Sequence, residues 1–364
     1  IVGRLFGFDS FMSSKRVLFL ATSPKTRGGI AAVLRAYSSL PFWKDYHVRW
    51  IGTHIDRSAA WKWLYAIKSL ICFLFCVWRY DLIHIHVGEL PSMRRKLVFC
   101  KIAKVLGKPV IIHLHIGNQL DDYTDNAVCR QLLQQADAII TLSQNIRQKV
   151  ASRFGVGDKV HVIYNPCPVV ENVRYSDEHK YVLFAGTLNQ NKGYSVLLTA
   201  FAKVAPDFPD WRLIIAGNGE LDQAKQLAET LKVARQVEFK GWVMGDEKAK
   251  LFRKASVFCL SSYAEGFPMA VLDAWSCGIP VVSTPVGGLP DVLVDGENAL
   301  LFQPGDVEAL AEKLHQILSL EPLRKQLSAA SLALSKGLFS MQTINDQLTA
   351  LYETCLNKEE DGNS

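Results

Sequence analysis

The sequence predicts an α/β protein built from two doubly wound, Rossmann-like parallel-sheet domains that face a cleft. Three observations point to this fold class. The chain has 364 residues, more than one average domain. Short apolar runs rich in β-branched residues alternate with helical patterns, and a polar, proline-bearing segment near residue 170 divides them into two series. The runs are continuously apolar, which is typical of parallel strands covered on both faces by helices.

The predicted strands follow in chain order. In the first series they cover residues 16–22, 81–86, 109–115, 136–143 and 159–165. In the second series they cover residues 181–186, 211–217, 237–241, 256–262 and 280–284. We therefore divide the chain into an N-terminal extension (1–14), a first domain (15–170), a second domain (171–340) and an amphipathic terminal helix with a disordered tail (341–364).

Charge is unevenly divided between the two predicted domains. Lys and Arg outnumber Asp and Glu by 23 to 10 in residues 1–170, and they are outnumbered by 18 to 25 in residues 171–364. Different partners for the two domains are therefore expected. No nucleic-acid recognition motif accompanies the basic half, so no nucleic-acid partner is expected. The eight cysteines form no CxxC pair, and residues 1–14 lack a secretory signal pattern, which predicts a cytoplasmic protein with reduced thiols.

Residues 61–80 form a long apolar segment within the basic half. Lys68 interrupts it, and the uninterrupted apolar run is under half the roughly 20 residues that a membrane span needs. We expect a helix buried between two strands; the alternative is an interfacial helix with Trp and Tyr at a bilayer surface. The helical segment 93–108 carries Arg94, Arg95, Lys96, Lys101, Lys104 and Lys108. These charges favour peripheral attachment to an anionic membrane surface, and the alternative is a solvated basic face.

Two carboxylates stand in the otherwise apolar stretch 261–288. Pro268 suits the first position of a helix and Gly278 the residue after its last turn, which places Glu265 in the preceding loop and Asp273 on the second turn. Ligands of doubly wound sheets bind beyond the carboxyl ends of the strands, where this loop lies. The backbone N–H groups at the helix start favour an anion such as phosphate, and the carboxylates suit hydroxyl groups.

Four histidines alternate along two predicted strands. Alternation places His84 and His86 on one face of their strand, and His113 and His115 on one face of theirs. A metal cluster is compatible with this spacing, but no Cys or carboxylate completes it. Buried, hydrogen-bonded side chains are expected for His84 and His113. His86 and His115 lie nearest the carboxyl ends of the strands and are the functional candidates.

An ordered set of motifs resembles the retaining glycosyltransferases of family four (glycosyl transferases group 1), which have the GT-B fold. The set covers roughly residues 15–320 and consists of Gly28–Gly29, "DLIHIH", "IIHLHIG", "ADAIITLSQNIR", "VIYNP", "FAGTLNQNKG", "IIAGNGE", and Glu265, seven residues, Asp273, then "STPVGG". The resemblance implies that the terminal helix packs back on the first domain. It also implies transfer of a hexosyl-type sugar from a nucleoside diphosphate sugar, with UDP or GDP as the nucleotide, to a glycan or lipid-linked acceptor in bacterial cell-surface polysaccharide or glycolipid assembly.

The resemblance assigns roles to individual residues. It implies catalytic roles for His115, Lys192 and Glu265. It implies donor binding by Gly28, Gly29, Gly186, Thr187, Lys192, Gly217, Trp242, Val243, Glu265, Gly266, Phe267, Pro268, Met269 and Asp273. It implies acceptor-side positions at His86, Asn118 and Ser143. Lys192 would meet the charge that develops on the leaving phosphate, and front-face attack by the acceptor would need no protein nucleophile.

Two positions depart from the family pattern. Thr187 stands where the family usually has Arg, so a bidentate phosphate contact is lost and Lys192 carries more of the charge. Asp273 stands in place of the second Glu. No Asp-x-Asp pair is present in the sequence, so neither a metal ion nor any cofactor besides the donor is expected. A nucleotide-sugar epimerase of the same two-domain plan and a non-catalytic sugar-nucleotide binding protein remain the alternative functions.

Overall fold

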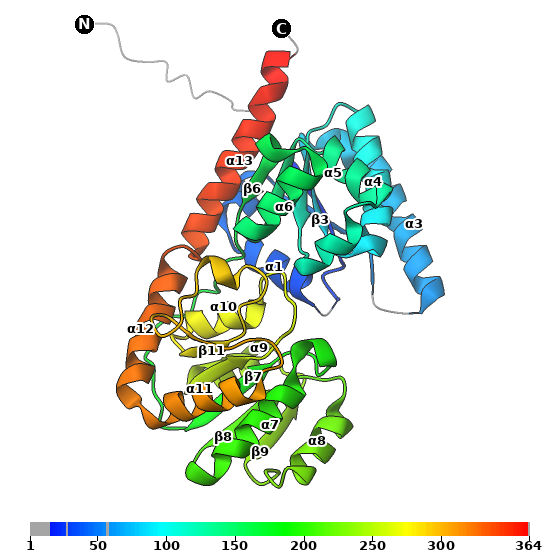
Figure 1. Cartoon of the computed structure of the whole chain (residues 1–364). Helices are drawn as coiled ribbons and strands as arrows, with labels where there is room; N and C mark the ends of the chain where they lie inside the picture. The colour runs from blue at the N-terminus through cyan, green and yellow to red at the C-terminus, as the bar shows by residue number, and fades with distance from the viewer. Residues whose placement is uncertain (1–14, 27, 56–57, 363–364) are drawn as a thin grey trace, which may run out of the picture.

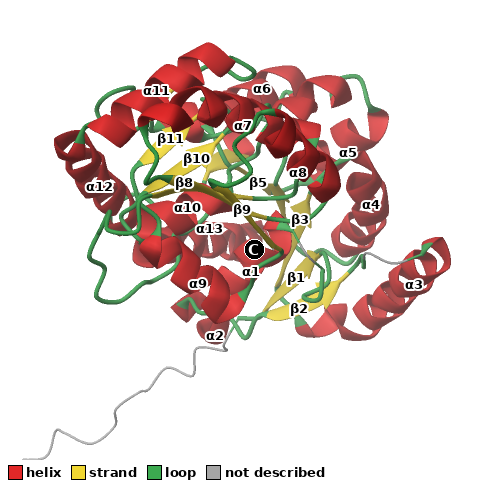
Figure 2. Ribbon diagram, turned by 90° about the horizontal axis from the view of Figure 1, so that it is seen from below, coloured by secondary structure: helices red, strands yellow, loops and turns green. Residues whose placement is uncertain are grey.

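The computed structural model describes residues 15–26, 28–55 and 58–362 (Figure 1). The predicted extension, residues 1–14, lies outside the described residues. Two parallel six-stranded sheets form the framework, one in each half of the chain, and helices cover both faces of each sheet (Figures 1 and 2). The predicted fold class is therefore confirmed.

The first sheet contains the strands of the basic half. They are β1 (Val17–Ala21), β2 (Arg49–Gly52), β3 (Leu82–Val87), β4 (Val110–Leu114), β5 (Ala138–Thr141) and β6 (Val160–Val162). Their spatial order is β2-β1-β3-β4-β5-β6, and all pairs are parallel. The order reverses direction between β1 and β3, so the loops that follow these two strands diverge to opposite faces of the sheet.

The second sheet repeats this plan with a different order. Its strands are β7 (Tyr181–Ala185), β8 (Arg212–Ala216), β9 (Val237–Gly241), β10 (Val257–Leu260), β11 (Val281–Ser283) and β12 (Leu300–Leu301). The spatial order is β12-β11-β10-β7-β8-β9, again parallel throughout. The reversal here lies between β7 and β10, which directs attention to the loops at 186–192 and 261–268.

Helices connect the strands. In the first half they are α1 (Gly29–Tyr37), α2 (Pro41–Asp45), α3 (Ala59–Cys76), α4 (Leu90–Val105), α5 (Ala127–Gln135) and α6 (Gln144–Phe154). In the second half they are α7 (Tyr194–Val204), α8 (Leu221–Thr230), α9 (Gly245–Lys254), α10 (Met269–Ser276), α11 (Val307–Ser319), α12 (Glu321–Lys336) and α13 (Met341–Gly362). Short 3-10 turns include η1 (Val77–Arg79), η2 (Asn118–Tyr123) and η4 (Gln190–Lys192).

Helix α13 returns to the first domain, as expected, and runs along its side (Figure 1). The Asn345 side chain accepts a hydrogen bond of 3.0 Å from the backbone N–H of Phe42. The Tyr352 hydroxyl lies 2.7 Å from Nδ1 of His84 on β3. The helix continues to Gly362, so the expected disordered tail is helical over its described part.

Aromatic residues join the two domains. Phe339 contacts Tyr164, Phe267 and Trp275, with ring centroids 5.1, 5.2 and 4.9 Å away. Asp291 adds a polar link, because its Oδ2 accepts hydrogen bonds from the Gln144 N–H at 2.7 Å and the Tyr164 hydroxyl at 3.1 Å. The carboxyl-end edges of the two sheets therefore meet in a packed interface.

The expectation of a buried helix at residues 61–80 was wrong. Helix α3 does connect two strands of the first sheet, β2 and β3, which lie on either side of β1. However, β2 is the edge strand, so only one face of α3 meets the domain and most of its large apolar side chains are exposed. Hydrophobicity alone does not distinguish a covered helix from an edge helix of this kind.

Candidate active site

The site begins with an ion pair between the two loops at the reversal point of the second sheet. Lys192 Nζ, after β7, pairs with Glu265 Oε1, after β10. The Ser262 hydroxyl donates to the same oxygen at 2.7 Å. Because hydrogen bonds from described residues reach only Oε1, the second carboxylate oxygen of Glu265 can accept from a ligand hydroxyl.

Backbone contacts fix Lys192 in this position. Its N–H donates to Asn189 Oδ1 at 3.0 Å, and its carbonyl accepts from the Ser261 hydroxyl at 3.0 Å. Gly193 follows with φ of 62°, a left-handed conformation that suits glycine, and a Cβ there would lie 2.1 Å from the Ser261 carbonyl oxygen. The amine is therefore presented on a short, tightly held turn.

The Glu265 loop is enclosed by glycines from both domains. A Cβ on Gly117, which follows β4, would lie 1.9 Å from the Glu265 carbonyl oxygen. A Cβ on Gly287 would lie 2.3 Å from the Gly266 carbonyl oxygen, which accepts a 2.9 Å hydrogen bond from Gly288. These close approaches bring the first domain's His115–Gly117 segment directly against the Glu265 loop.

The predicted donor loops of the second domain also lie together. The Gly186 N–H donates to the Ala216 carbonyl at 3.0 Å, and a Cβ on Gly217 would lie 1.8 Å from the Gly186 carbonyl oxygen. Thr187 is exposed beside them. The structure thus places Gly186, Thr187 and Gly217 in one loop pair beside Lys192, whose side chain reaches within 3.9 Å of the Cβ position of Gly186.

Gly28 and Gly29 open helix α1 on the first domain. Gly28 is the N-cap, with φ of 145°, and a Cβ on either glycine would meet no atom within 4 Å. The start of α1 is therefore an open backbone surface, as a phosphate-approaching loop requires. Helix α1 packs against α10 of the second domain (Figure 1).

Asp273 does not share the ion pair of Glu265. Its Oδ2 lies 2.5 Å from Nζ of Lys248 on α9, and burial raises the pKa of this carboxyl while Lys248 opposes the rise. The contacts of the described residues therefore place the two carboxylates in separate ion pairs. Trp242 and Val243 lie in the loop between β9 and α9, with Trp242 exposed.

Three further residues predicted for the donor side occupy the domain junction. Phe267 is buried in the aromatic cluster around Phe339, so its ring serves interdomain packing. Pro268 is the N-cap of α10 and Met269 its first residue, as the sequence predicted within one position. The backbone at this helix start, rather than the Phe267 ring, is the part that a ligand can approach.

The acceptor-side candidates are placed differently from one another. Ser143 is fully buried and caps α6, accepting a 3.1 Å hydrogen bond from the Ile146 N–H. Asn118 begins η2, directly after Gly117. His86 lies behind His115, with 2.8 Å between His86 Nδ1 and His115 Nε2. His115, the catalytic candidate, is partly exposed and lies next to the Glu265 loop.

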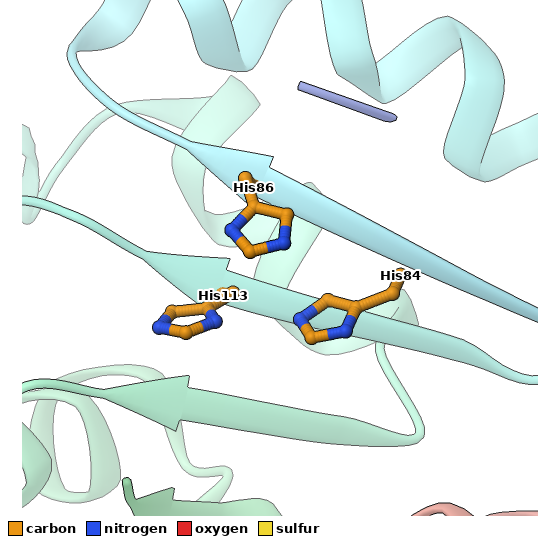
Figure 3. A group of neighbouring side chains, drawn as sticks. All are labelled: His84, His86 and His113. Carbon is orange, nitrogen blue, oxygen red and sulfur yellow. The ribbon is translucent and has the colours of Figure 1, made fainter. Parts of the chain in front are cut away.

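The four histidines form one stack on a single face of the first sheet. Ring centroids are 4.5 Å apart for His84 and His86, 4.8 Å for His86 and His113, and 4.3 Å for His113 and His115. Figure 3 shows three of the rings side by side. His84 is buried and bonded to Tyr352, as predicted, whereas neither ring nitrogen of His113 has a hydrogen-bond partner among the described residues.

Burial keeps the stack neutral. It lowers the pKa of His84 and of His115 to about 3, with smaller contributions from neighbouring positive charge, and it lowers the pKa of His86 and His113 well below the usual value. Lys96 is fully buried beneath the stack and donates to the His86 carbonyl; burial lowers its pKa to about 7. A neutral His115 can orient a hydroxyl group without contributing charge.

The histidine stack also gathers three nitrogen ligands that could be considered for a metal ion. The ligand atoms of His84, His86 and His113 all lie within 4.8 Å of one another. However, these rings are within 28° of parallel, and a nitrogen lone pair lies in its ring plane, so stacked rings do not aim at a common point. Zinc needs nitrogen ligands that converge at about 2.0–2.1 Å. The arrangement does not fit a metal ion without reorientation of the rings.

Sequence reasoning missed residues that the fold brings to the site. Lys248 stands among several charged residues of α9, and nothing in its spacing singles it out. Ser262 and Asn191 were also missed, although Ser262 lies three positions before Glu265 and Asn191 directly precedes Lys192; Asn191 Nδ2 donates to the Ala264 carbonyl at 3.0 Å. Proximity to the Lys192 and Glu265 motifs was the available signal for these two.

Two doubly wound domains that meet at their carboxyl-end edges are the architecture of the GT-B class of transferases. Comparisons with known proteins agree. Residues 17–169 match the family model "Glycosyltransferase Family 4", and residues 171–332 match "Glycosyl transferases group 1". The phosphatidyl-myo-inositol mannosyltransferase of Mycobacterium tuberculosis is 27% identical over 355 residues, which cover 93% of this chain and 92% of that protein.

Solved structures show the same fold. Anabaena Alr3699/HepE in complex with UDP-glucose superposes with a TM-score of 0.75 at 20% identity, covering 93% of this chain and 99% of that one. The sucrose-phosphate synthase of Thermosynechococcus elongatus gives a TM-score of 0.77 at 18% identity, covering 94% of this chain and all of that one. The chain belongs to the family-four glycosyltransferases of the GT-B fold.

Proposed function

We propose that this glycosyltransferase moves a hexosyl-type sugar from a nucleoside diphosphate sugar to an acceptor hydroxyl with retention of anomeric configuration. The observation that carries the proposal is the Lys192–Glu265 pair, held against the His115–Gly117 segment of the opposite domain. The comparison structures of Anabaena Alr3699/HepE with UDP and with UDP-glucose support a UDP-sugar or a chemically similar donor.

Each residue has a distinct task in this proposal. Lys192 faces the diphosphate and stabilises the negative charge that develops on it as the glycosidic bond to phosphate breaks. The free oxygen of Glu265 accepts from a sugar hydroxyl. The starts of α1 and α10 offer backbone N–H groups to phosphate oxygens. Neutral His115 orients the sugar or the acceptor, and the leaving phosphate takes the acceptor proton, so neither a protein nucleophile nor a metal ion is invoked.

The acceptor is proposed to be a glycan or lipid-linked glycan in cell-surface polysaccharide or glycolipid assembly, on the inner face of the cytoplasmic membrane. The name of the mycobacterial relative, a phosphatidyl-myo-inositol mannosyltransferase, supports a lipid-linked acceptor. The basic first half of the chain supports contact with an anionic surface.

A donor panel tests the proposal. UDP-, GDP-, ADP- and TDP-sugars would be compared by thermal shift and slow hydrolysis on wild type, Lys192→Ala and the control Lys203→Ala, whose lysine pairs with Glu308 on the surface of the same domain. We expect one donor to raise Tm and to hydrolyse, with both effects lost only in Lys192→Ala. No response to any donor would overturn the proposal, conversion of a donor into its epimer would indicate an epimerase, and binding without turnover would indicate a binding protein. The anomeric configuration of the product tests retention.

A further inference from the structure

Helix α3 presents a wide apolar face to solvent. Its exposed large apolar side chains are Trp61, Trp63, Leu64, Ile67, Ile71, Leu74 and Phe75, and Trp78 in η1 continues the row. Spacings of three and four residues place them on one side of the helix. The exposed fractions are large, at 73% for Trp63, 83% for Phe75 and 67% for Trp78. An apolar stripe this long is unusual on a protein surface and indicates a binding partner.

The opposite side of α3 holds the helix on the domain. Ser69, Phe73, Cys76 and Val77 are buried, and the Phe73 ring packs edge-on against Phe99 of α4 with centroids 5.2 Å apart. The stretch Trp61–Arg79 is long and apolar enough to cross a membrane, but only 22% of it is buried. Crossing a bilayer would require this buried side to leave the domain. A helix lying in the plane of the bilayer surface keeps these contacts.

Basic side chains surround the apolar stripe. Neither α3 nor α4 contains an Asp or Glu, and residues 59–108 hold nine Lys or Arg, all but the buried Lys96 at least partly exposed, against two acidic residues. Helix α4 lies beside α3 in both views (Figures 1 and 2). Arg94, Val98, Lys101 and Val105 are exposed at spacings of four, three and four, so they form one stripe on α4. Exposed Lys62 and Lys68 add charge on α3 itself.

We propose that this α3–α4 face docks on an anionic phospholipid bilayer, with α3 lying at the level of the headgroups. Tryptophan side chains favour this interface, and basic residues beside it are attracted by anionic lipids. A second copy of the chain is a poorer occupant, because pairing two such faces would bring their lysines and arginines together without any acidic residue of α3 or α4 to offset them.

The docking face is connected to the interdomain site. Helix α3 follows the carboxyl end of β2, so its first turns lie on the side of the domain that faces the second domain. The Tyr65 hydroxyl donates to Ser23 Oγ at 3.1 Å, in the loop that leads to Gly28. Docking would therefore hold the interdomain junction close to the bilayer, where a lipid-linked acceptor can reach it. This last step rests on the proposed function, whereas bilayer binding itself does not.

Vesicle flotation of the full chain tests the proposal. Vesicles of phosphatidylcholine and phosphatidylglycerol in equal parts would be compared with vesicles of phosphatidylcholine alone. The docking variants are Ile71→Ser/Phe75→Ser/Trp78→Ser and Arg94→Glu/Lys101→Glu. The matched controls on the second domain are Val294→Ser/Leu320→Ser, which are exposed apolar residues, and Lys225→Glu/Arg235→Glu, which are exposed basic residues.

We expect wild type and both controls to bind anionic vesicles, weakly at high salt, and both docking variants to lose about tenfold or more in binding. Brominated lipid should quench wild-type tryptophan fluorescence. Equal flotation of all variants, or no binding by wild type, would overturn the proposal. A third outcome would also overturn it: wild type fails to bind vesicles but forms a dimer, and only the apolar docking variant loses that dimer. Donor-induced Tm shifts, measured on the same variants, distinguish failure of the docking proposal from failure of the proposed function. The docking variants should retain these Tm shifts, because the donor site is unchanged.

Discussion

Gly117 of the first domain approaches Glu265 of the second so closely that a Cβ on Gly117 would lie 1.9 Å from the Glu265 carbonyl oxygen. The two residues follow β4 and β10, the strands whose carboxyl ends meet across the interface. A glycine at position 117 therefore allows the loop that carries Glu265 to rest against the segment that carries His115. The relationship ties the geometry of the Lys192–Glu265 pair to the position of the first domain.

A methyl group at position 117 should disturb this arrangement. In Gly117→Ala either the Glu265 loop or the first domain must move by more than an ångström, because the clashing atom is backbone. Displacements of that size cost about 100-fold in rate when they misplace reacting groups. We expect kcat for transfer or donor hydrolysis to fall by about that factor, while donor affinity for the second domain falls less.

Gly157→Ala is the control for this substitution. Its Cβ would meet the nearest atom, Cβ of Ala151, at 3.5 Å, which is an ordinary contact. Steady-state kinetics on the two variants and wild type give the comparison. Full activity in Gly117→Ala would show that the packing of Gly117 on Glu265 does not position the reacting groups.

The Lys248–Asp273 pair should show its contribution to stability through pH. Lys248→Met removes the cation that opposes the effect of burial, so the pKa of Asp273 should rise further. An acid whose folded pKa lies above its unfolded value lowers stability at high pH, and the loss is relieved as pH falls through the folded pKa. We expect Lys248→Met to be less stable than wild type by about 1–2 kcal/mol at pH 8, since Lys248 is partly exposed.

The deficit of Lys248→Met should shrink toward pH 5, and Asp273→Asn in the same background should recover most of it at pH 8. Thermal unfolding of wild type, both variants and Lys203→Met provides the test. Lys203 pairs with Glu308 at the surface, so its substitution should have a small effect that does not vary with pH. A deficit for Lys248→Met that is constant with pH would contradict this account.

Tyr352 links the terminal helix to the histidine stack, and its hydroxyl should contribute to stability. Tyr352→Phe would leave buried Nδ1 of His84 without its 2.7 Å partner. Loss of one partner of a buried hydrogen bond costs about 1–3 kcal/mol. Tyr46→Phe is the control, because Tyr46 packs against the same Tyr352 ring with centroids 5.4 Å apart but is only partly buried. Equal falls in Tm for the two variants would show that the hydroxyl of Tyr352 adds nothing.

The sequence predicted ten of the twelve strands, including the edge strands β6 and β9, but it missed the opposite edge strands, β2 and β12. Strand β2 has mostly exposed or half-buried side chains, and β12 has only two residues, so neither shows a continuous apolar run. Edge strands are short and mixed in composition for physical reasons, since they face solvent and must resist pairing with other chains. The spatial order of the strands could not be predicted either, because no local sequence pattern shows which strands a crossover connection makes neighbours.

Site residues could be predicted from the sequence where a short motif in one chain segment contains them. Lys192 and Glu265 lie in loops directly after buried strands, and their motifs predicted a pair of loops that the fold does bring together. Lys248 could not be found in this way, because only the tertiary arrangement brings it to Asp273. The packing of the Phe267 ring could not be predicted for a related reason: its partner Phe339, at the domain junction, lies 72 positions further along the chain.

The histidine stack should make the protein sensitive to acid. A histidine whose folded pKa lies below its unfolded value contributes no penalty above about pH 6.5, and stability is lost as pH falls from there toward the folded pKa. For His84 and His115 that window runs down to about 3. Each such histidine should lower the free energy of unfolding by about 1.4 kcal/mol per pH unit within it. We expect Tm to fall steeply below about pH 6.

The substitution His113→Leu tests one member of the stack. Neither His113 nitrogen has a hydrogen-bond partner among the described residues, so the substitution removes a titrating ring without breaking a hydrogen bond among them. Its Tm should fall less steeply with acid than that of wild type, so the two curves converge or cross below pH 6. Exposed His179→Leu is the control and should follow wild type. Parallel curves for His113→Leu and wild type would mean that the ring takes up its proton in the folded chain as readily as in the unfolded one. In that case burial would not be keeping His113 neutral, which would contradict this account of the stack.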